Sequence, residues 1–199
     1  MRKLDISINE MLSIEKEPRR YELIILQQPE VSRRSMLNDK ERRCVDPPPI
    51  LQLKIYDRYG RLDDDALRSP YWVVHSSLAT HTPLSTPLQQ SQILQGLLTS
   101  SAHYCTRTEL HDSGSFFHFS DLSFTTTGVY QLKFTLTSVY SLPIFLGELP
   151  TLAEAISNPI RVYTPKDFPG MAQSTPLAKS LAEQSVLIPI RNENHRIRQ

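Results

Sequence analysis

The segment Gly128-Val129-Tyr130-Gln131-Leu132-Lys133-Phe134-Thr135-Leu136-Thr137 determines the fold class. From Tyr130 to Thr137 apolar and polar side chains alternate strictly. This period of two is typical of a strand that buries one face and exposes the other. Gly128 stands directly before it, and glycine readily adopts the positive φ of a turn. We therefore predict a strand over Val129–Tyr140 that follows a turn.

Six more short runs of β-forming residues lie between prolines and turns. They are Tyr21–Gln28, Leu51–Tyr56, Tyr71–Leu78, Ser115–Phe119, Pro159–Thr164 and Ser185–Ile190. Leu51–Tyr56 places Leu51, Leu53 and Ile55 on one face, which predicts a half-buried strand. Gln92–Ser100 fits a helix or a strand, because the period of a short apolar run does not separate the two.

Two short helices are expected near the C-terminus. Thr151–Ser157 ends before Pro159, because the residue that precedes a proline avoids the α region. Ser174–Gln184 has the stronger pattern, with Thr175 suited to the N-cap and Pro176 to the first helical position.

Many short strands, few helices and 15 prolines predict a mainly β fold, an immunoglobulin-like antiparallel β-sandwich. A length of 199 residues suits one domain with a substantial core. We expect an N-terminal extension at residues 1–19, helical in pattern, one domain at 20–191, and a basic tail at 192–199.

No run of 18 apolar residues occurs, and the N-terminal segment lacks the apolar centre of a signal peptide. The two cysteines, Cys44 and Cys105, are too few for a disulfide framework. No Asn-x-Ser/Thr acceptor occurs. These features predict a soluble intracellular protein with no membrane partner.

Catalytic motifs are scarce. Asp112-Ser113-Gly114 resembles the aspartic-protease motif, but those enzymes need two such aspartates and the chain has one copy. A turn between two strands explains the tripeptide as well. No nucleophile elbow, Walker loop or glycine-rich dinucleotide turn occurs. We expect no enzyme, no cofactor and no small-molecule substrate.

Metal ligation is also not expected. Asp63-Asp64-Asp65 lacks the alternate spacing and the distal glutamate of a calcium loop, so a solvated acidic turn is the better interpretation. The nearest zinc-like pair, His103-x-Cys105, would need ligands from elsewhere in the chain.

Positive charge lies at the two flanks of the chain. The totals, 22 Lys and Arg against 21 Asp and Glu, exclude a uniformly basic nucleic-acid-binding protein. The basic residues of the segment 31–43 are Arg33, Arg34, Lys40, Arg42 and Arg43, and those after Val186 are Arg191, Arg196 and Arg198. If the fold brings these ends together, they form one positive face; otherwise they are solvated loops.

The basic segment leads into Pro47-Pro48-Pro49, directly before the strand predicted at Leu51–Tyr56. Three prolines restrict the chain, so the loop loses little freedom when it docks on a partner. Arginines on such a loop suit phosphate oxygens and, in a groove, the O6/N7 edge of guanine. Alternatively, Glu41 and Asp46 pair with these arginines and the loop only caps the sandwich.

Three blocks of sequence, in order, resemble the fungal velvet domain over roughly residues 20–191. Tyr21–Pro29 with Arg42–Pro49 resembles its opening, and Phe116–Ser123 through Gly128–Phe134 resembles its central motif. The C-terminal block comprises Ser157–Pro159, Val162-Tyr163, Lys166–Met171, Ser174-Thr175 and Ile188–Arg191.

The resemblance implies a Rel-homology-like sandwich in a nuclear transcriptional regulator that shuttles with the cytoplasm and controls development, sporulation and secondary metabolism. It implies binding to double-stranded DNA as a homodimer or as a heterodimer with other velvet proteins. The DNA-contacting loop of the family maps onto Lys40, Arg42 and Arg43, and Arg33 and Arg34 lie in the same loop. Further contacts to the DNA backbone are expected from Arg191, Arg196 and Arg198.

A second hypothesis is an interaction subunit that dimerises with another velvet protein and modulates it without binding DNA. The family's usual Ala-Cys-Gly-x-Gly element is replaced here by Arg34-Ser35-Met36-Leu37-Asn38. This departure and the near-neutral net charge favour the second hypothesis.

Overall fold

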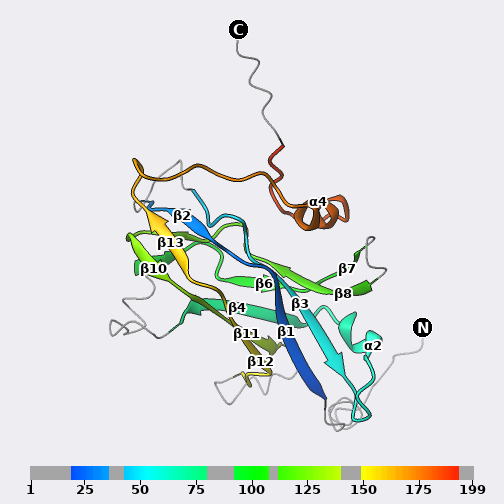
Figure 1. Cartoon of the computed structure of the whole chain (residues 1–199). Helices are drawn as coiled ribbons and strands as arrows, with labels where there is room; N and C mark the ends of the chain where they lie inside the picture. Colours follow the sequence, from blue (N-terminus) through cyan, green and yellow to red (C-terminus); the bar gives the residue numbers. More distant parts are fainter. Residues whose placement is uncertain (1–18, 36–42, 80–91, 108–111, 140–148, 193–199) are drawn as a thin grey trace, which may run out of the picture.

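The computed structural model describes residues 19–35, 43–79, 92–107, 112–139 and 149–192 (Figure 1). Two four-stranded antiparallel sheets form the layers of a β-sandwich. The strands of the first layer, in spatial order, are β1 (Arg20–Gln27), β3 (Ile50–Tyr56), β8 (Asp112–His118) and β7 (His103–Arg107). Those of the second are β12 (Ala153–Ile156), β11 (Leu132–Ser138), β4 (Trp72–Leu78) and β6 (Thr99–Ser101). The predicted antiparallel β-sandwich is confirmed.

A three-stranded sheet forms one end of the molecule (Figure 1). Its strands are β10 (Gly128–Tyr130), β13 (Ile160–Tyr163) and β2 (Val31–Arg33). The central strand, β13, runs antiparallel to β10 and parallel to β2. Two shorter strands, β5 (Leu94–Gln95) and β9 (Ser123–Phe124), pair with each other. The region Gln92–Ser100, which fitted a helix or a strand, contains both: residues 92 and 93 are helical, and β5 and the start of β6 follow.

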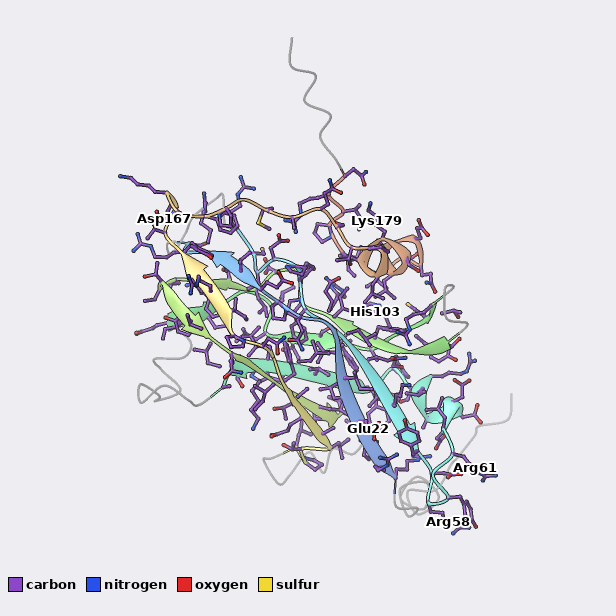
Figure 2. The ribbon with its side chains drawn as sticks, viewed as in Figure 1. Glu22, Arg58, Arg61, His103, Asp167 and Lys179 are labelled. Carbon is purple, nitrogen blue, oxygen red and sulfur yellow. The ribbon has the colours of Figure 1, made fainter. Side chains whose placement is uncertain are left out.

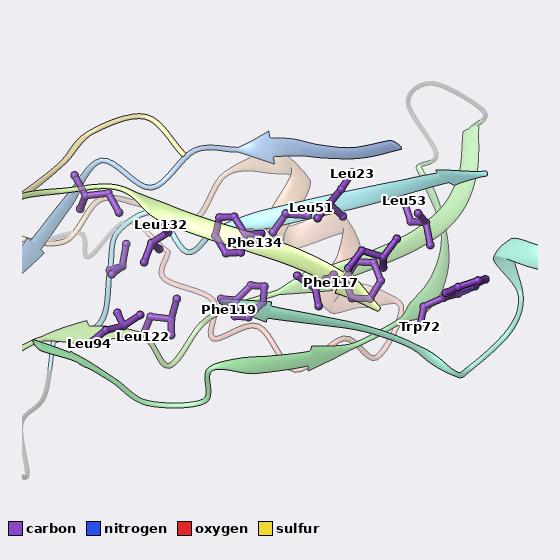
Figure 3. Close-up of a cluster of buried hydrophobic side chains, with 14 of the residues drawn as sticks. Leu23, Leu51, Leu53, Trp72, Leu94, Phe117, Phe119, Leu122, Leu132 and Phe134 are labelled. Atoms are coloured by element: carbon purple, nitrogen blue, oxygen red, sulfur yellow. The ribbon is translucent and has the colours of Figure 1, made fainter. Parts of the chain in front are cut away.

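The main core fills the space between the two layers (Figure 3). Leu51, Leu53 and Ile55 point into it from β3, as predicted, and all three are fully buried. From the opposite layer, Phe134 of β11 packs with its ring centroid 5.1 Å from that of Phe119. Each such side chain contributes about 1.5–3 kcal/mol to folding when it is fully buried.

A second apolar cluster covers the outer face of the first layer. Its buried members are Ile50, Cys105, Phe116, Ala178, Leu181, Val186 and Ile188. The C-terminal members come from α4 and the segment that follows it, so the first part of β3 is covered on both faces and Gln52 is buried too. The half-buried strand predicted at Leu51–Tyr56 is confirmed at Lys54 and Tyr56, which stay partly exposed, and is wrong at Gln52. Local periodicity carries no information about a helix more than a hundred residues later.

Helix α4 (Pro176–Glu183) confirms the helix predicted at Ser174–Gln184. The Thr175 hydroxyl oxygen accepts a hydrogen bond from the backbone N–H of Ala178 at 3.1 Å, and Pro176 occupies the first turn, as predicted. The same hydroxyl donates to the side-chain oxygen of Gln27, whose amide nitrogen donates to the carbonyl of Pro48 at 2.7 Å. The helix cap is thereby connected to β1 and to the proline segment.

The helix predicted at Thr151–Ser157 is wrong, because this segment forms strand β12. It pairs with β11 in a register that places Ala155 opposite Phe134. The second layer supplies a neighbouring strand whose backbone groups need partners, and this tertiary pairing outweighs local helix propensity.

The strand predicted over Val129–Tyr140 is divided at Gln131, and its two parts belong to different sheets. The Gln131 carbonyl accepts from the backbone N–H of Ala79 at 2.8 Å, and its side chain donates to the carbonyl of Ser157 at 2.9 Å. Gly128 has φ 152°, so the predicted positive φ is confirmed, although this residue begins β10. Tyr140 lies outside the described residues.

The strand predicted at Ser185–Ile190 is also wrong, since these residues belong to no sheet. Val186 and Ile188 are buried, whereas Leu187 is 84% exposed. The alternation is therefore real, but it arises because an extended segment lies on the second apolar cluster. A helical extension was expected at residues 1–19. Residues 1–18 of it lie outside the described residues.

His118, at the end of β8, lies where this C-terminal segment meets the sheet. Its ring centroid is 5.5 Å from that of His103, and its Nδ1 is 3.2 Å from the Ser120 hydroxyl. The Ser120 hydroxyl donates to the carbonyl of Leu187 at 3.4 Å. Burial, and secondarily the charge of His103, lower the pKa of His118 to about 4.

This lowered pKa predicts a loss of stability in acid. The unfolded chain takes up a proton on this ring near pH 6.5, whereas the folded protein does so only near pH 4, so stability falls as the pH decreases between these values. After a discount for partial solvent access, we expect roughly 1–2 kcal/mol of the loss between pH 7 and 5 to come from His118.

Urea unfolding of the wild type and of His118→Gln at both pH values measures this contribution. The exposed His75 on β4 provides a matched control, His75→Gln, which should retain the wild-type pH dependence. An equal loss of stability in the wild type and in His118→Gln would contradict the assignment.

Candidate nucleic-acid interface

Two backbone hydrogen bonds close the base of the basic segment predicted at residues 31–43. The N–H of Val31 donates to the carbonyl of Asp46 at 2.9 Å, and the N–H of Asp46 donates to the carbonyl of Val31 at 2.8 Å. The two chain positions that flank the basic segment are thus hydrogen-bonded to each other. Lys40 and Arg42 lie outside the described residues.

A second pair of hydrogen bonds fixes the same base to the sandwich. The N–H of Ser35 donates to the carbonyl of Phe124 at 2.8 Å, and the N–H of Val45 donates to that of Leu122 at 2.7 Å. We call the four residues Val31, Ser35, Val45 and Asp46 the neck. Because both acceptors lie in or beside β9, the neck is tied to the main core.

The carboxylate of Asp46 joins the neck to the C-terminal segment. Its side chain is only 3% exposed; Oδ1 lies 2.7 Å from Nη2 of Arg191, and Oδ2 accepts from the N–H of Ala172 at 2.5 Å. The fold therefore brings Arg191 to the base of the basic segment. Glu41 lies outside the described residues, so its suggested pairing with the loop arginines stays a prediction. Asp46 was also suggested to pair with those arginines, and it forms an ion pair with Arg191.

Besides Arg191, the structure places three more predicted site residues at this end of the molecule. Arg33 is the last residue of β2 and is half-buried, and Arg34 follows with its N–H donating to the carbonyl of Tyr163 at 2.9 Å. Arg43 is exposed on the other side of the neck. Arg196 and Arg198 lie outside the described residues.

Two cations at this end were missed by sequence reasoning. Arg161 is exposed on β13, the strand that pairs with β2, and Lys166 is exposed shortly after it. The alternation in Ile160–Tyr163 places Arg161 on the solvent side, which was a usable signal. The parallel pairing of β13 with β2 joins segments far apart in the chain and leaves no local trace in the sequence.

At the opposite end of the molecule, several arginines form ion pairs with nearby carboxylates (Figure 2). The ion pairs there, with their distances, are Arg19–Asp63 (3.0 Å), Arg20–Glu22 (2.5 Å), Arg61–Asp57 (2.9 Å) and Arg68–Asp64 (3.1 Å). By contrast, Arg34, Arg43, Arg161 and Lys166 form no ion pair within the described part of the chain. Cations without a carboxylate partner among the described residues suit a surface that receives a polyanion.

The Asp-Ser-Gly tripeptide, which resembles a protease motif, is part of a strand. Asp112-Ser113-Gly114 lies within strand β8, so the expected turn at this tripeptide is wrong; in the pairing with β7, Gly114 stands opposite Cys105. Cys105 is buried, and burial raises the pKa of its thiol.

The expected solvated acidic turn at Asp63–Asp65 is the start of a short helix, α2 (Asp64–Leu67). Asp63 caps it by accepting from the N–H of Ala66 at 3.0 Å, and Asp64 accepts from the Tyr104 hydroxyl at 2.8 Å. Across the described ranges, no group of three or more His, Cys, Asp or Glu side chains is arranged to hold a metal ion. Nor does any helix in these ranges have the length and apolarity to cross a membrane.

The contact between Asp46 and Arg191 should contribute measurably to stability. Removal of one partner from a largely buried pair leaves an unsatisfied charge or unsatisfied donors, so we expect each of Asp46→Ala and Arg191→Ala to cost roughly 1–3 kcal/mol. The double variant should cost less than the sum, with a coupling of about 1 kcal/mol or more.

Urea unfolding of the four proteins in this double-mutant cycle measures the coupling. The exposed pair Arg20–Glu22 supplies a matched cycle, in which we expect less than about 0.5 kcal/mol of coupling. Additive losses at Asp46 and Arg191 would show that their contact does not hold the neck.

Comparison with known proteins identifies the family. The velvet factor family model matches residues 21–86 and 81–195. The sexual development regulator VELC of Pyricularia oryzae is 37% identical over 185 residues, which cover 88% of this chain and 42% of that protein. The spore development regulator vosA of Beauveria bassiana is 35% identical over 188 residues, covering 88% of this chain and 67% of the relative.

A third relative, from Chaetomium globosum, is named as a component of the velvet complex and is 33% identical over 182 residues, covering 89% of this chain and 39% of the relative. The chain spans 42%, 45% and 40% of the length of three sexual development regulators that it matches. The resemblance inferred from the three sequence blocks is confirmed, and the chain belongs to the velvet family.

Proposed function

We propose that this chain is a DNA-binding transcriptional regulator that acts in the nucleus as a dimer and controls development, sporulation and secondary metabolism. Its relatives are named as regulators of sexual or spore development, and the developmental part of the proposal follows from them. Binding to DNA is proposed from the arrangement of charge around the neck.

The observation that supports DNA binding most is the contrast between the two ends of the molecule. Around the neck, Arg34, Arg43 and Arg161 have no carboxylate partner among the described residues, whereas Arg19, Arg20, Arg61 and Arg68 at the far end form ion pairs. Duplex DNA carries about one negative charge per 1.7 Å of its axis, so cations that have no carboxylate partner within the described ranges are attracted to it along its length.

The neck also suits the basic segment to binding. Since its two ends are hydrogen-bonded to the sandwich, less conformational freedom is lost when the segment docks on DNA. In this proposal Lys40, Arg42 and Arg43 contact phosphates, and at least one arginine contacts the edge of a guanine. Phosphate contacts orient the protein, and the base contact gives sequence preference.

The alternative is an interaction subunit that has kept the fold and does not bind DNA. One relative is named as a component of the velvet complex, which supports assembly with other proteins, and the replaced Ala-Cys-Gly-x-Gly element supports a changed loop. This alternative predicts that Arg42→Ala with Arg43→Ala leaves dimerisation unchanged and has no effect on retention by DNA.

Fluorescence anisotropy on random-sequence and promoter duplexes, at about 50 and 200 mM salt, tests the proposal. We expect salt-sensitive binding by the wild type and a loss of binding in the Lys40→Ala/Arg42→Ala/Arg43→Ala variant. Three phosphate contacts in the wild type should give a slope of log K against log salt of about −2.7.

A matched control removes three positive charges at the opposite end, Arg20→Ala/Arg58→Ala/Arg61→Ala, and should bind like the wild type. If a folded wild type, with its dimer confirmed by light scattering, binds none of the duplexes, the interaction-subunit alternative replaces the proposal. Equal loss in both triple variants would mean that net charge, and not the loop, drives the binding.

A further inference from the structure

We propose that the outward face of the three-stranded sheet β10-β13-β2 is a second DNA-contacting surface, with Arg161 and Tyr163 of β13 and Arg33 of β2 as its contact residues. This inference rests on the proposed function and extends it, because it adds to the basic loop a rigid surface that no loop motif predicts.

The register of the sheet places these side chains on one face. Arg161 lies opposite Val129 on one side and Val31 on the other, and Tyr163 lies opposite Arg33. Residues that are opposite each other in neighbouring strands share a face, and residues two apart along a strand do so as well. The five side chains therefore form two adjacent rows on the same surface.

The other face of the sheet points into the protein, which fixes the direction of the first. Ile160, Val162 and Ser32 are buried there, and the Tyr130 ring stacks on Phe124 with the centroids 5.0 Å apart. On the outward face Arg161 is exposed and Val129 is 59% exposed, so this surface is open to a partner.

The chemistry of the outward face suits a nucleic acid. The Arg161 guanidinium carbon lies 6.0 Å from the centre of the Tyr163 ring, at the limit of a cation–π contact, and Arg161 has no ion pair within the described residues. An arginine gives a phosphate two parallel donors, and a tyrosine hydroxyl is a common donor to DNA phosphates. Val129 adds an apolar surface for deoxyribose.

Continuity with the neck favours DNA over an acidic peptide as the occupant. Strand β2 belongs to both surfaces: Val31 is bridged to Asp46, and the N–H of Arg34 is bonded to the carbonyl of Tyr163. A rigid backbone therefore holds the sheet face beside the base of the basic segment. A duplex is long enough to contact the base of the loop and this face together, whereas a short peptide would occupy only one of them.

The charged side chains around the neck and the sheet face also favour DNA as the partner. Within residues 30–35, 43 and 161–167 the charged side chains are Glu30, Arg33, Arg34, Arg43, Arg161, Lys166 and Asp167. Five are cationic and two are anionic, and Asp167 is engaged by the Thr164 hydroxyl at 2.5 Å.

The test measures duplex affinity for Arg161→Ala, Arg161→Glu and Tyr163→Phe across several salt concentrations. We expect Arg161→Ala to weaken binding to all sequences alike, by about 3–10-fold, and to reduce the salt slope by about 0.9. Arg161→Glu should weaken binding further, and Tyr163→Phe should lose affinity without a change in slope.

The control is Arg58→Ala, which removes an exposed arginine at the opposite end (Figure 2) and should leave affinity and slope unchanged.

The outcomes separate this inference from the proposed function. If the wild type binds DNA, the loop variant does not, and Arg161→Ala binds like the wild type with an unchanged slope, the sheet-face surface is wrong and the proposed function stands. If the folded wild type binds no duplex, both are wrong. Arg161-dependent binding of an acidic peptide such as polyglutamate, without an effect on DNA, would replace DNA by a protein partner at this face.

Discussion

The buried carboxylate of Asp46 is the constraint on which the architecture of the charged end depends. It accepts hydrogen bonds from Arg191 and Ala172 of the C-terminal segment, and the backbone of the same residue is bridged to Val31. A buried carboxylate is costly unless its oxygens are satisfied, so the C-terminal segment has to remain in place for the neck to be stable. One aspartate thereby links β2, the proline segment and the end of the chain.

In a chain with almost no net charge, this arrangement leaves several described cations at one end without a carboxylate partner among the described residues. Carboxylates at the β3–α2 end neutralise neighbouring arginines such as Arg61 and Arg68. At the neck, the buried Asp46 is satisfied by Arg191, which leaves Arg34, Arg43 and others without a carboxylate among the described residues. Net charge is a poor guide to partners here, because what a partner meets is the distribution of unpaired charge.

Local patterns predicted those elements whose stability is mostly local. The helix α4 was correctly expected from Thr175 and Pro176, since a cap and a first-turn proline act within one turn. Thr151–Ser157 was wrongly expected to be a helix, because the backbone partner that makes it a strand is β11, which lies beyond the reach of any local pattern. Of the candidate site, the loop arginines were predicted from their place before three prolines together with the family resemblance, whereas Arg161 was missed because its strand reaches this end only through long-range pairing.

The sequence by itself determined the sandwich class, the capped helix, the basic segment and the family, because period-two alternation, capping residues and motif order are all properties of neighbouring residues. Only the tertiary structure decided that Gln52 is buried, that Arg191 pairs with Asp46, and that Arg161 lies on the same face of the sheet as Arg33. These facts depend on which distant segments cover a face or share a hydrogen bond. Burial and hydrogen-bond satisfaction over the whole chain select these pairings. A local stretch of sequence contains only one of the two partners, so it does not predict the pairing.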